Sequence, residues 1–224
     1  MKVCLITYDT PHRKTSEVFF NLQNQGKFSL SFLQVPFKSR PERDVLLTHR
    51  PRQFEGPKTR DLAEAYDLPF HDYERRYDVL EESDYLIVCG ANILEPVFAN
   101  SGKILNCHSG LIPLVRGLDS FKWAILDGRP IGNTLHIIDE HADAGQVLHQ
   151  VRTPIFADDS IEEFAARHYA FEMWILSNFD KFLDGGEIFD LETGEPRMRM
   201  PKEVEQSMLD SFDDYKKKYA GRNS

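Results

Sequence analysis

The chain has 224 residues, of which 41% are hydrophobic and 28% charged, and its formal net charge is −9. This size and composition fit a folded protein with one ordinary core and exclude disorder as the default. The acidic balance argues against a dedicated nucleic-acid binder.

The beginning of the chain is apolar only over residues 1–6, before Asp9, His12 and Arg13. Such a run is too short for a signal-peptide core or a membrane span. The three cysteines have no paired spacing, so they indicate no disulfide framework. We therefore expect a cytoplasmic protein with no membrane partner.

The first half of the chain alternates between predicted strands and helices. The predicted elements are a strand at 3–7, a helix at 16–25, a strand at 28–37, a helix at 59–66 and a strand at 68–73. Three prolines exclude a continuous helix or central strand between residues 38 and 60. The apolar run 85–89 is typical of a central parallel strand that is buried on both faces. Residues 104–108 form the next predicted strand.

The second half continues with a predicted helix at 118–126 and strands at 133–138 and 146–155. A long helix is predicted from Ser160 to about Leu183, because Ser160 and Glu163 have the spacing of a capping box. A turn at 194–196 is followed by a predicted charged helix over 202–219. The alternation favours an α/β protein with a mostly parallel sheet flanked by helices.

The most informative segment runs from Ile104 to Gly145. Asn106 and His108 lie two residues apart on a predicted strand, so their side chains point to the same face. Cys107 points to the other face, which argues against a Cys107–His108 nucleophilic pair. Ligands of open α/β sheets gather beyond the carboxyl ends of the strands. Asn106 and His108 lie at such an end, and Asp143 lies in the loop after another predicted strand.

This ordered pattern resembles the folate-dependent formyltransferase superfamily. The resemblance is carried by Asn106-x-His108-Ser109-x-Leu111-x-Pro113, then Gly117, then Asp139-x-x-x-Asp143-x-Gly145. It implies a Rossmann-like formyltransferase fold with a catalytic domain over 1–184 and a short helical extension over 185–224. It also implies N10-formyltetrahydrofolate as formyl donor and a homodimer.

The chemistry of the three residues agrees with formyl transfer. The Asn106 amide can donate to the oxygen that gains negative charge, and His108 can move a proton near neutral pH. Asp143 can orient His108 or stabilise its cationic form. The resemblance implies that His136 lies near the formyl group and that two loops bind the folate. Those loops correspond to Asn92, Ile93 and Leu94 and to Ile138, Asp139, Glu140, His141 and Asp143.

The remaining polar residues indicate no further catalytic chemistry. The histidines and acids around His136 and His149 match no compact zinc signature, so we expect no metal. The cysteines are most simply small core side chains. Residues 38–60 carry seven Lys or Arg against three acids, which favours either a phosphate-binding segment or a solvated loop. The expected acceptor-binding residues are Lys38, Arg40, Arg50, Arg52, Arg116 and Lys122.

The branches of the superfamily differ in the molecule that accepts the formyl group. Methionyl-tRNA formyltransferases carry a further C-terminal domain, and formyltetrahydrofolate hydrolases a further N-terminal one; we expect neither here. Glycinamide ribonucleotide transformylases hold the substrate phosphate with a glycine-rich first turn, whereas residues 7–12 contain no glycine. The segments 116–123 and 134–139 look most like sugar N-formyltransferases, which act on nucleotide-linked amino sugars for surface polysaccharides. Glycinamide ribonucleotide transformylase and a non-catalytic folate-binding protein stay as alternatives.

Overall fold

The computed structural model describes residues 1–37, 43–74, 77–91, 94–140 and 145–221. Its strands are β1 (Lys2–Tyr8), β2 (Ser29–Val35), β3 (Phe70–Asp72), β4 (Tyr85–Val88), β5 (Ile104–His108), β6 (Arg116–Gly117), β7 (Gly132–Ile137), β8 (Gln146–Arg152) and β9 (Pro196–Arg197). Its α-helices are α1 (Arg13–Gln25), α2 (Thr59–Ala65), α3 (Asp78–Glu82), α4 (Pro96–Ala99), α5 (Ser120–Leu126), α6 (Ile161–Ser177), α7 (Lys202–Asp210) and α8 (Phe212–Tyr219).

Seven of the strands form one mostly parallel sheet, in the order β3-β2-β1-β4-β5-β7-β8. The pairs β1–β2, β1–β4, β2–β3 and β4–β5 are all parallel. The predicted α/β class is therefore confirmed. The chain divides into two compact units, which are described separately below: unit 1 (Met1–Arg40, Arg52–Asn106, Ile137–His141) and unit 2 (Pro41–Pro51, Cys107–His136, Ala142–Ser224).

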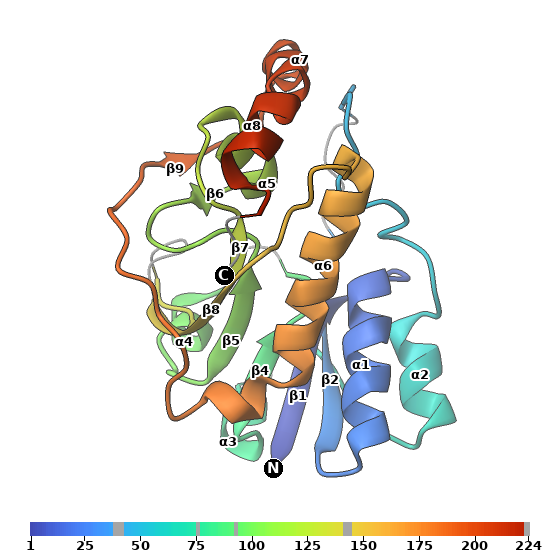
Figure 1. Cartoon of the computed structure of the whole chain (residues 1–224). Helices are drawn as coiled ribbons and strands as arrows, with labels where there is room; N and C mark the ends of the chain where they lie inside the picture. The colour runs from blue at the N-terminus through green and yellow to red at the C-terminus, as the bar shows by residue number, and fades with distance from the viewer. Residues whose placement is uncertain (38–42, 75–76, 92–93, 141–144, 222–224) are drawn as a thin grey trace. The chain divides into compact units, whose positions relative to one another are not determined.

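Unit 1 is built around β1, which lies between β2 and β4. Its strand residues 3–6 are almost completely buried, as expected for an inner strand with helices packed on the sheet. Helix α1 packs against β1 and α2 against β2 (Figure 1). One apolar cluster of this unit joins strand residues to α4 through Phe98, and its members include Cys4, Ile6, Leu33, Leu86, Phe98 and Ile104.

Unit 2 buries a second apolar cluster that joins α5, α6 and the C-terminal helices. Phe121 and Phe164 contribute from α5 and α6, and Met208, Phe212 and Tyr215 contribute from α7 and α8. Figure 1 shows α7 and α8, in red, beside α5. Buried residues on both sides of position 184 therefore belong to this one cluster.

Several element boundaries differ from the sequence expectations. The helix predicted to reach about Leu183 ends at Ser177 and is followed by a 3₁₀ turn, Phe179–Phe182. The helix predicted over 202–219 is two helices, α7 and α8, with Ser211 between them. The segments α3, α4, β6 and β9 were not predicted, because elements of two to five residues show no readable periodicity. Within the described part of the chain, no helix has the length and apolar character needed to cross a membrane.

Candidate active site

Strand β5 positions the two most informative residues, Asn106 and His108. Ile104 and Leu105 are completely buried and Cys107 is 4% exposed, which gives the strand its place inside the sheet. Asn106 is half-buried and is the last residue of the unit 1 segment Arg52–Asn106. His108 is buried and belongs to unit 2. Side chains alternate along a strand, so Asn106 and His108 share one face and Cys107 faces the other. The three cysteines of the chain, all described, are buried and form no disulfide.

The His108 imidazole has two oxygen atoms close to Nε2 within unit 2. Nε2 lies 3.0 Å from the Val115 carbonyl oxygen and 3.1 Å from the Ser120 hydroxyl. Ser120 in turn donates to the Gly117 carbonyl oxygen at 2.9 Å. Sequence reasoning did not identify this role of Ser120, because nothing in the spacing of residues 108 and 120 indicates that they meet.

The loop after β5 is held by polar side chains of β7 and β8, all in unit 2. The buried Thr134 hydroxyl donates to the Gly110 carbonyl oxygen at 2.7 Å and accepts from the Ile112 amide at 3.0 Å. Gln150, which is completely buried, donates to the Ile112 carbonyl oxygen at 2.6 Å. Buried polar groups of this kind need these partners, so the hydrogen bonds fix the path of the loop next to His108. His136, which also lies on β7, is 1% exposed.

A second histidine of unit 2, His168 on α6, is completely enclosed. Its Nδ1 lies 2.8 Å from the Thr153 hydroxyl. Burial first, and then the positive charge of Arg50, lower the pKa of His168 from 6.5 to about 3. His168 is thus neutral at neutral pH and serves as a structural group rather than as a proton carrier.

The two loops expected to bind a folate meet the same apolar cluster of unit 1. Leu94 and Ile138 are half-buried and pack against the cluster that contains Phe98 and Ile104. The Ile138 amide donates to the Ile104 carbonyl oxygen at 2.9 Å, which ties the second loop to β5. Asp139 is half-buried and Glu140 is exposed. The expected site residues Asn92, Ile93, His141 and Asp143 lie outside the described residues.

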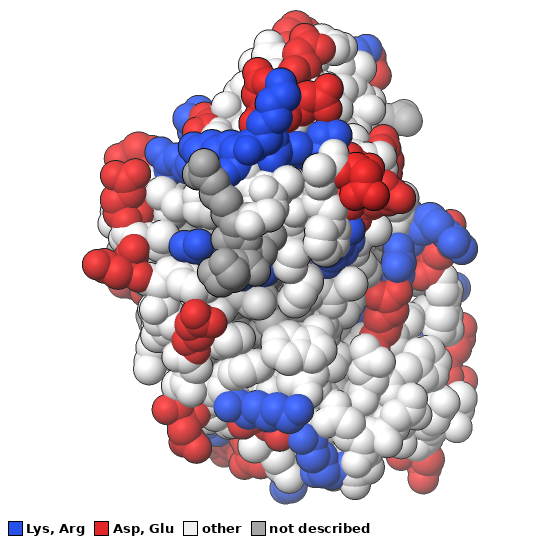
Figure 2. All heavy atoms as spheres, in the orientation of Figure 1, with Lys and Arg blue, Asp and Glu red and all other residues white. Residues whose placement is uncertain are grey.

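The residues expected to bind the acceptor have varied surroundings. Lys122 is almost completely buried and pairs with the buried carboxylate of Glu205 at 2.5 Å, while Arg50 pairs with the buried Glu172. Arg52 is exposed and pairs with Glu55 at 2.6 Å, and Arg116 is half-buried. Lys38 and Arg40 lie outside the described residues. On the face in Figure 2, basic side chains gather near the C-terminal helices, and acidic side chains lie next to them.

The turn after β1 is filled by side chains. The Tyr8 hydroxyl donates to the Ala91 carbonyl oxygen at 2.8 Å, and the Tyr8 ring meets the edge of His12 at 5.3 Å. The carboxylate of Asp9 accepts from the Phe37 amide at 2.8 Å. This turn therefore presents a negative charge and aromatic rings, and not the glycine backbone that commonly receives a phosphate at a helix N-terminus.

Comparison with known proteins shows what part of this chain is similar to. Residues 80–179 match the family model described as formyl transferase. Phosphoribosylglycinamide formyltransferase of Haemophilus influenzae is 41% identical over 88 residues, which are 38% of this chain and 42% of that protein. The same enzyme of Escherichia coli is 31% identical over 48% of this chain and 50% of its own length. The chain thus aligns with half or less of these curated relatives.

Solved structures extend the likeness in fold. A sugar N-formyltransferase from a Shewanella species superposes with a TM-score of 0.60 at 18% identity, covering 95% of this chain and 88% of its own. Phosphoribosylglycinamide formyltransferase of Streptococcus pneumoniae superposes with a TM-score of 0.57 at 21% identity, covering 82% of this chain and 99% of its own. Residues 80–179 are therefore similar to the formyl transferase family, and the fold of the chain is similar to the folds of these two solved structures.

Proposed function

We propose that this protein transfers a formyl group from N10-formyltetrahydrofolate to the amino group of a nucleotide-linked aminodeoxysugar. The observation that carries the reaction type is the strand β5, which bears Asn106 and His108 on one face inside the matched formyl transferase domain. N10-formyltetrahydrofolate is the formyl donor that the superfamily resemblance implies. The formyl donor, the acceptor and the role of each residue all belong to this proposal.

The proposed chemistry forms one C–N bond and breaks another. The acceptor amine attacks the formyl carbon, and the bond between that carbon and N10 of the folate breaks. The Asn106 amide donates to the formyl oxygen as negative charge develops there. His108 takes the proton that the amine loses and returns it to N10, so that no proton is gained or lost overall. Asp143 stabilises the charged form of His108.

The donor is proposed to lie against the two loops of unit 1. Half-buried Leu94 and Ile138 over a common apolar cluster fit a flat ring system, because such a surface removes aromatic area from water. Asn92, Ile93, His136, Asp139, Glu140 and His141 complete the proposed folate site. When it is bound, the folate supplies the activated formyl group.

The acceptor proposal depends on the turn after β1. Asp9, Tyr8 and His12 occupy the place where a glycine-rich turn would hold the phosphate of glycinamide ribonucleotide. We therefore favour a nucleotide diphosphate held elsewhere, by Lys38, Arg40, Arg52 and Arg116. Lys122 and Arg50 already neutralise buried carboxylates, which makes them the weakest members of the expected set.

The alternative acceptor, glycinamide ribonucleotide, is favoured by one specific observation. The two curated relatives compared above, from Haemophilus influenzae and Escherichia coli, both carry the name phosphoribosylglycinamide formyltransferase. The alignments cover only part of each protein, so these names describe the relatives and leave the acceptor of this chain to experiment.

The test supplies the purified protein with N10-formyltetrahydrofolate and, in separate reactions, glycinamide ribonucleotide or one of a panel of nucleotide-linked 4-amino sugars. Mass spectrometry then identifies the formylated product. We expect a formylated amino sugar, and Asn106→Ala and His108→Ala should each lower kcat at least about 100-fold. Formylation of glycinamide ribonucleotide alone would transfer the proposal to purine synthesis.

We also propose that the enzyme works in the cytoplasm as a homodimer and contributes to surface polysaccharide synthesis. Sedimentation equilibrium of the full chain measures the oligomeric state directly, and a monomer at micromolar concentration would contradict the homodimer. The superfamily resemblance supports the homodimer and the role in polysaccharide synthesis.

A further inference from the structure

Two oxygen atoms surround a single ring nitrogen of His108, and their chemistry determines which nitrogen carries the proton. The Val115 carbonyl oxygen, 3.0 Å from Nε2, can only accept a hydrogen bond. If Nε2 lacked a hydrogen, its lone pair would face the lone pairs of this oxygen at contact distance. Nε2 therefore carries a hydrogen in the neutral ring as well as in the charged one.

The Ser120 hydroxyl fits the same assignment. Its one hydrogen is directed to the Gly117 carbonyl oxygen at 2.9 Å, so its lone pairs are oriented to accept from Nε2 at 3.1 Å. Ser120 is 2% exposed and Val115 is 5% exposed, so water does not compete at these contacts. The Nε2–H group thus has two buried acceptors, both on the segment 115–120.

The surrounding backbone leaves little room for the ring to turn. A Cβ atom on Gly110 would come within 2.8 Å of His108 Nε2 and 2.7 Å of the Val115 carbonyl oxygen. Gly110 is itself held by the Thr134 hydroxyl, and the Val115 amide donates to the Leu111 carbonyl oxygen at 2.8 Å. The glycine, the carbonyl and the serine together form a clamp around Nε2, which we call the Nε2 clamp (Gly110, Val115, Ser120).

From this geometry we infer that Ser120 is a positioning residue that holds neutral His108 as the Nε2–H tautomer, with the lone pair on Nδ1. The catalytic meaning of this inference rests on the proposed function: the proton lost by the amine goes to Nδ1 and leaves from Nδ1 to N10 of the folate. Nε2 keeps its hydrogen throughout. A ring fixed in one tautomer pays no cost for proton rearrangement before each turnover.

The experiment combines nuclear magnetic resonance with kinetics on the full chain. The protein is labelled with ¹⁵N-histidine, and the ring nitrogens of His108 are assigned by comparison with His108→Gln. Spectra are read at the alkaline end of a titration, where the ring signals no longer change. For the wild type we expect the signature of hydrogen on Nε2 and a lone pair on Nδ1.

The variants separate positioning from folding. Ser120→Ala leaves the Val115 carbonyl as the one remaining acceptor of the pair, so Nε2–H should stay the major tautomer with a smaller population than in the wild type. Its kcat should fall about 5- to 10-fold with little change in KM, which is the effect of losing one hydrogen bond. Ser120→Thr keeps the hydroxyl and should restore both the spectrum and kcat. Ser211→Ala is the matched control, because Ser211 also donates to the carbonyl three residues earlier, Met208, at 2.8 Å. It should leave the His108 spectrum and kcat unchanged.

Two results would overturn the inference: an Nδ1–H tautomer in the wild type, or an unchanged tautomer and unchanged kcat in Ser120→Ala. Thermal unfolding of each variant shows whether the fold is intact, and the spectrum of a folded Ser120→Ala protein is informative even without activity. If the wild type formylates none of the acceptors but shows the Nε2–H signature, the proposed function fails and the tautomer assignment stands.

Discussion

His168, at the residue scale, shows how burial alone sets a protonation state. The folded protein binds a proton at His168 only near pH 3, whereas an unfolded chain binds it near pH 6.5. Acidification below pH 6.5 therefore stabilises the unfolded state by protonation. The contribution of His168 to stability is complete above pH 6.5 and is lost as the pH falls toward 3.

The prediction is that His168→Gln reduces the pH dependence of stability. Between about pH 7 and about pH 5, the free energy of unfolding of the wild type should fall by about 2 kcal/mol more than that of the variant. Urea unfolding of both proteins at the two pH values measures this difference. Equal pH dependence in the two proteins would mean that folded His168 is protonated more easily than its environment indicates.

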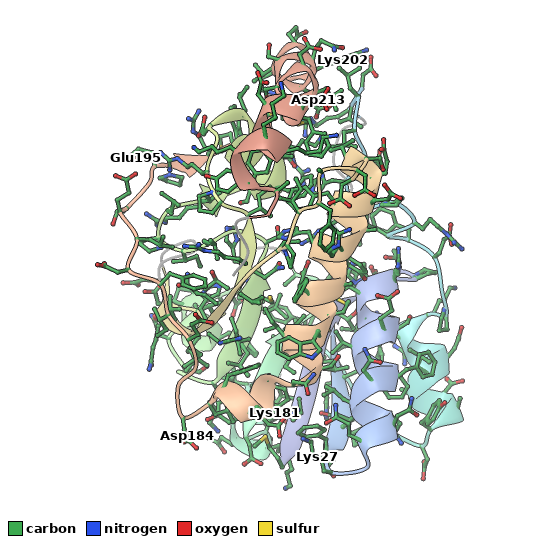
Figure 3. The ribbon with its side chains drawn as sticks, in the orientation of Figure 1. Lys27, Lys181, Asp184, Glu195, Lys202 and Asp213 are labelled. Atoms are coloured by element: carbon green, nitrogen blue, oxygen red, sulfur yellow. The ribbon has the colours of Figure 1, made fainter. Side chains whose placement is uncertain are left out.

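Helix α7, at the scale of the element, is anchored by one buried carboxylate. Glu205 is completely buried and accepts hydrogen bonds from Lys122 Nζ at 2.5 Å and from the Leu46 amide at 2.6 Å. Lys202 at the start of the same helix is labelled in Figure 3 and pairs with Asp44 at the surface. Exposed pairs contribute little to stability, whereas a buried charge that loses its partner is costly.

We predict that Glu205→Gln lowers the free energy of unfolding by about 3–5 kcal/mol, because the Lys122 charge stays buried without a counter-charge. The matched control is Glu203→Gln on the exposed face of α7, which should change stability by less than about 0.5 kcal/mol. Chemical denaturation of the two variants gives both values. Equally small losses of unfolding free energy in the two variants would show that the Lys122 ammonium group binds water or another acceptor.

The C-terminal helices matter for unit 2 as a whole. The centre of the Phe164 ring, on α6, lies 6.2 Å from the centre of the Phe212 ring and 6.1 Å from the centre of the Tyr215 ring. Met208, Phe212 and Tyr215 are buried in the same cluster, and each contributes about 1.5–3 kcal/mol by leaving water. Their sum is comparable to the whole net stability of an ordinary domain.

Deletion of residues 201–224 is therefore expected to abolish cooperative unfolding of unit 2 and to cause aggregation. Differential scanning calorimetry and amide spectra of the shortened protein test this. Deletion of residues 222–224 alone is the control and should leave the melting temperature unchanged. A shortened protein that melts like the full chain would make residues 185–224 the separable extension that the sequence suggested.

Local patterns were enough to predict much of this fold. The apolar runs of β1, β4 and β5 identify inner strands, and the capping box of α6 forms as its spacing indicates, with the Glu163 amide donating to the Ser160 hydroxyl at 3.2 Å. An apolar run and a capping box depend only on residues that are close together in the sequence, so a local pattern is enough to predict them. The predictions of a helix that reaches about Leu183 and of one continuous helix over 202–219 were wrong, because a helical pattern continues past points where packing ends the helix.

The same division holds for the site. By itself, the sequence determined the strand that bears Asn106 and His108, since alternation along a strand puts both side chains on one face. The Nε2 clamp was decided only by tertiary structure. Ser120 reaches His108 because Thr134 and Gln150, from strands further along the chain, hold the loop after β5 with buried hydrogen bonds. The cause is physical: a strand's alternation is local, whereas the path of a loop depends on the distant groups that satisfy its backbone.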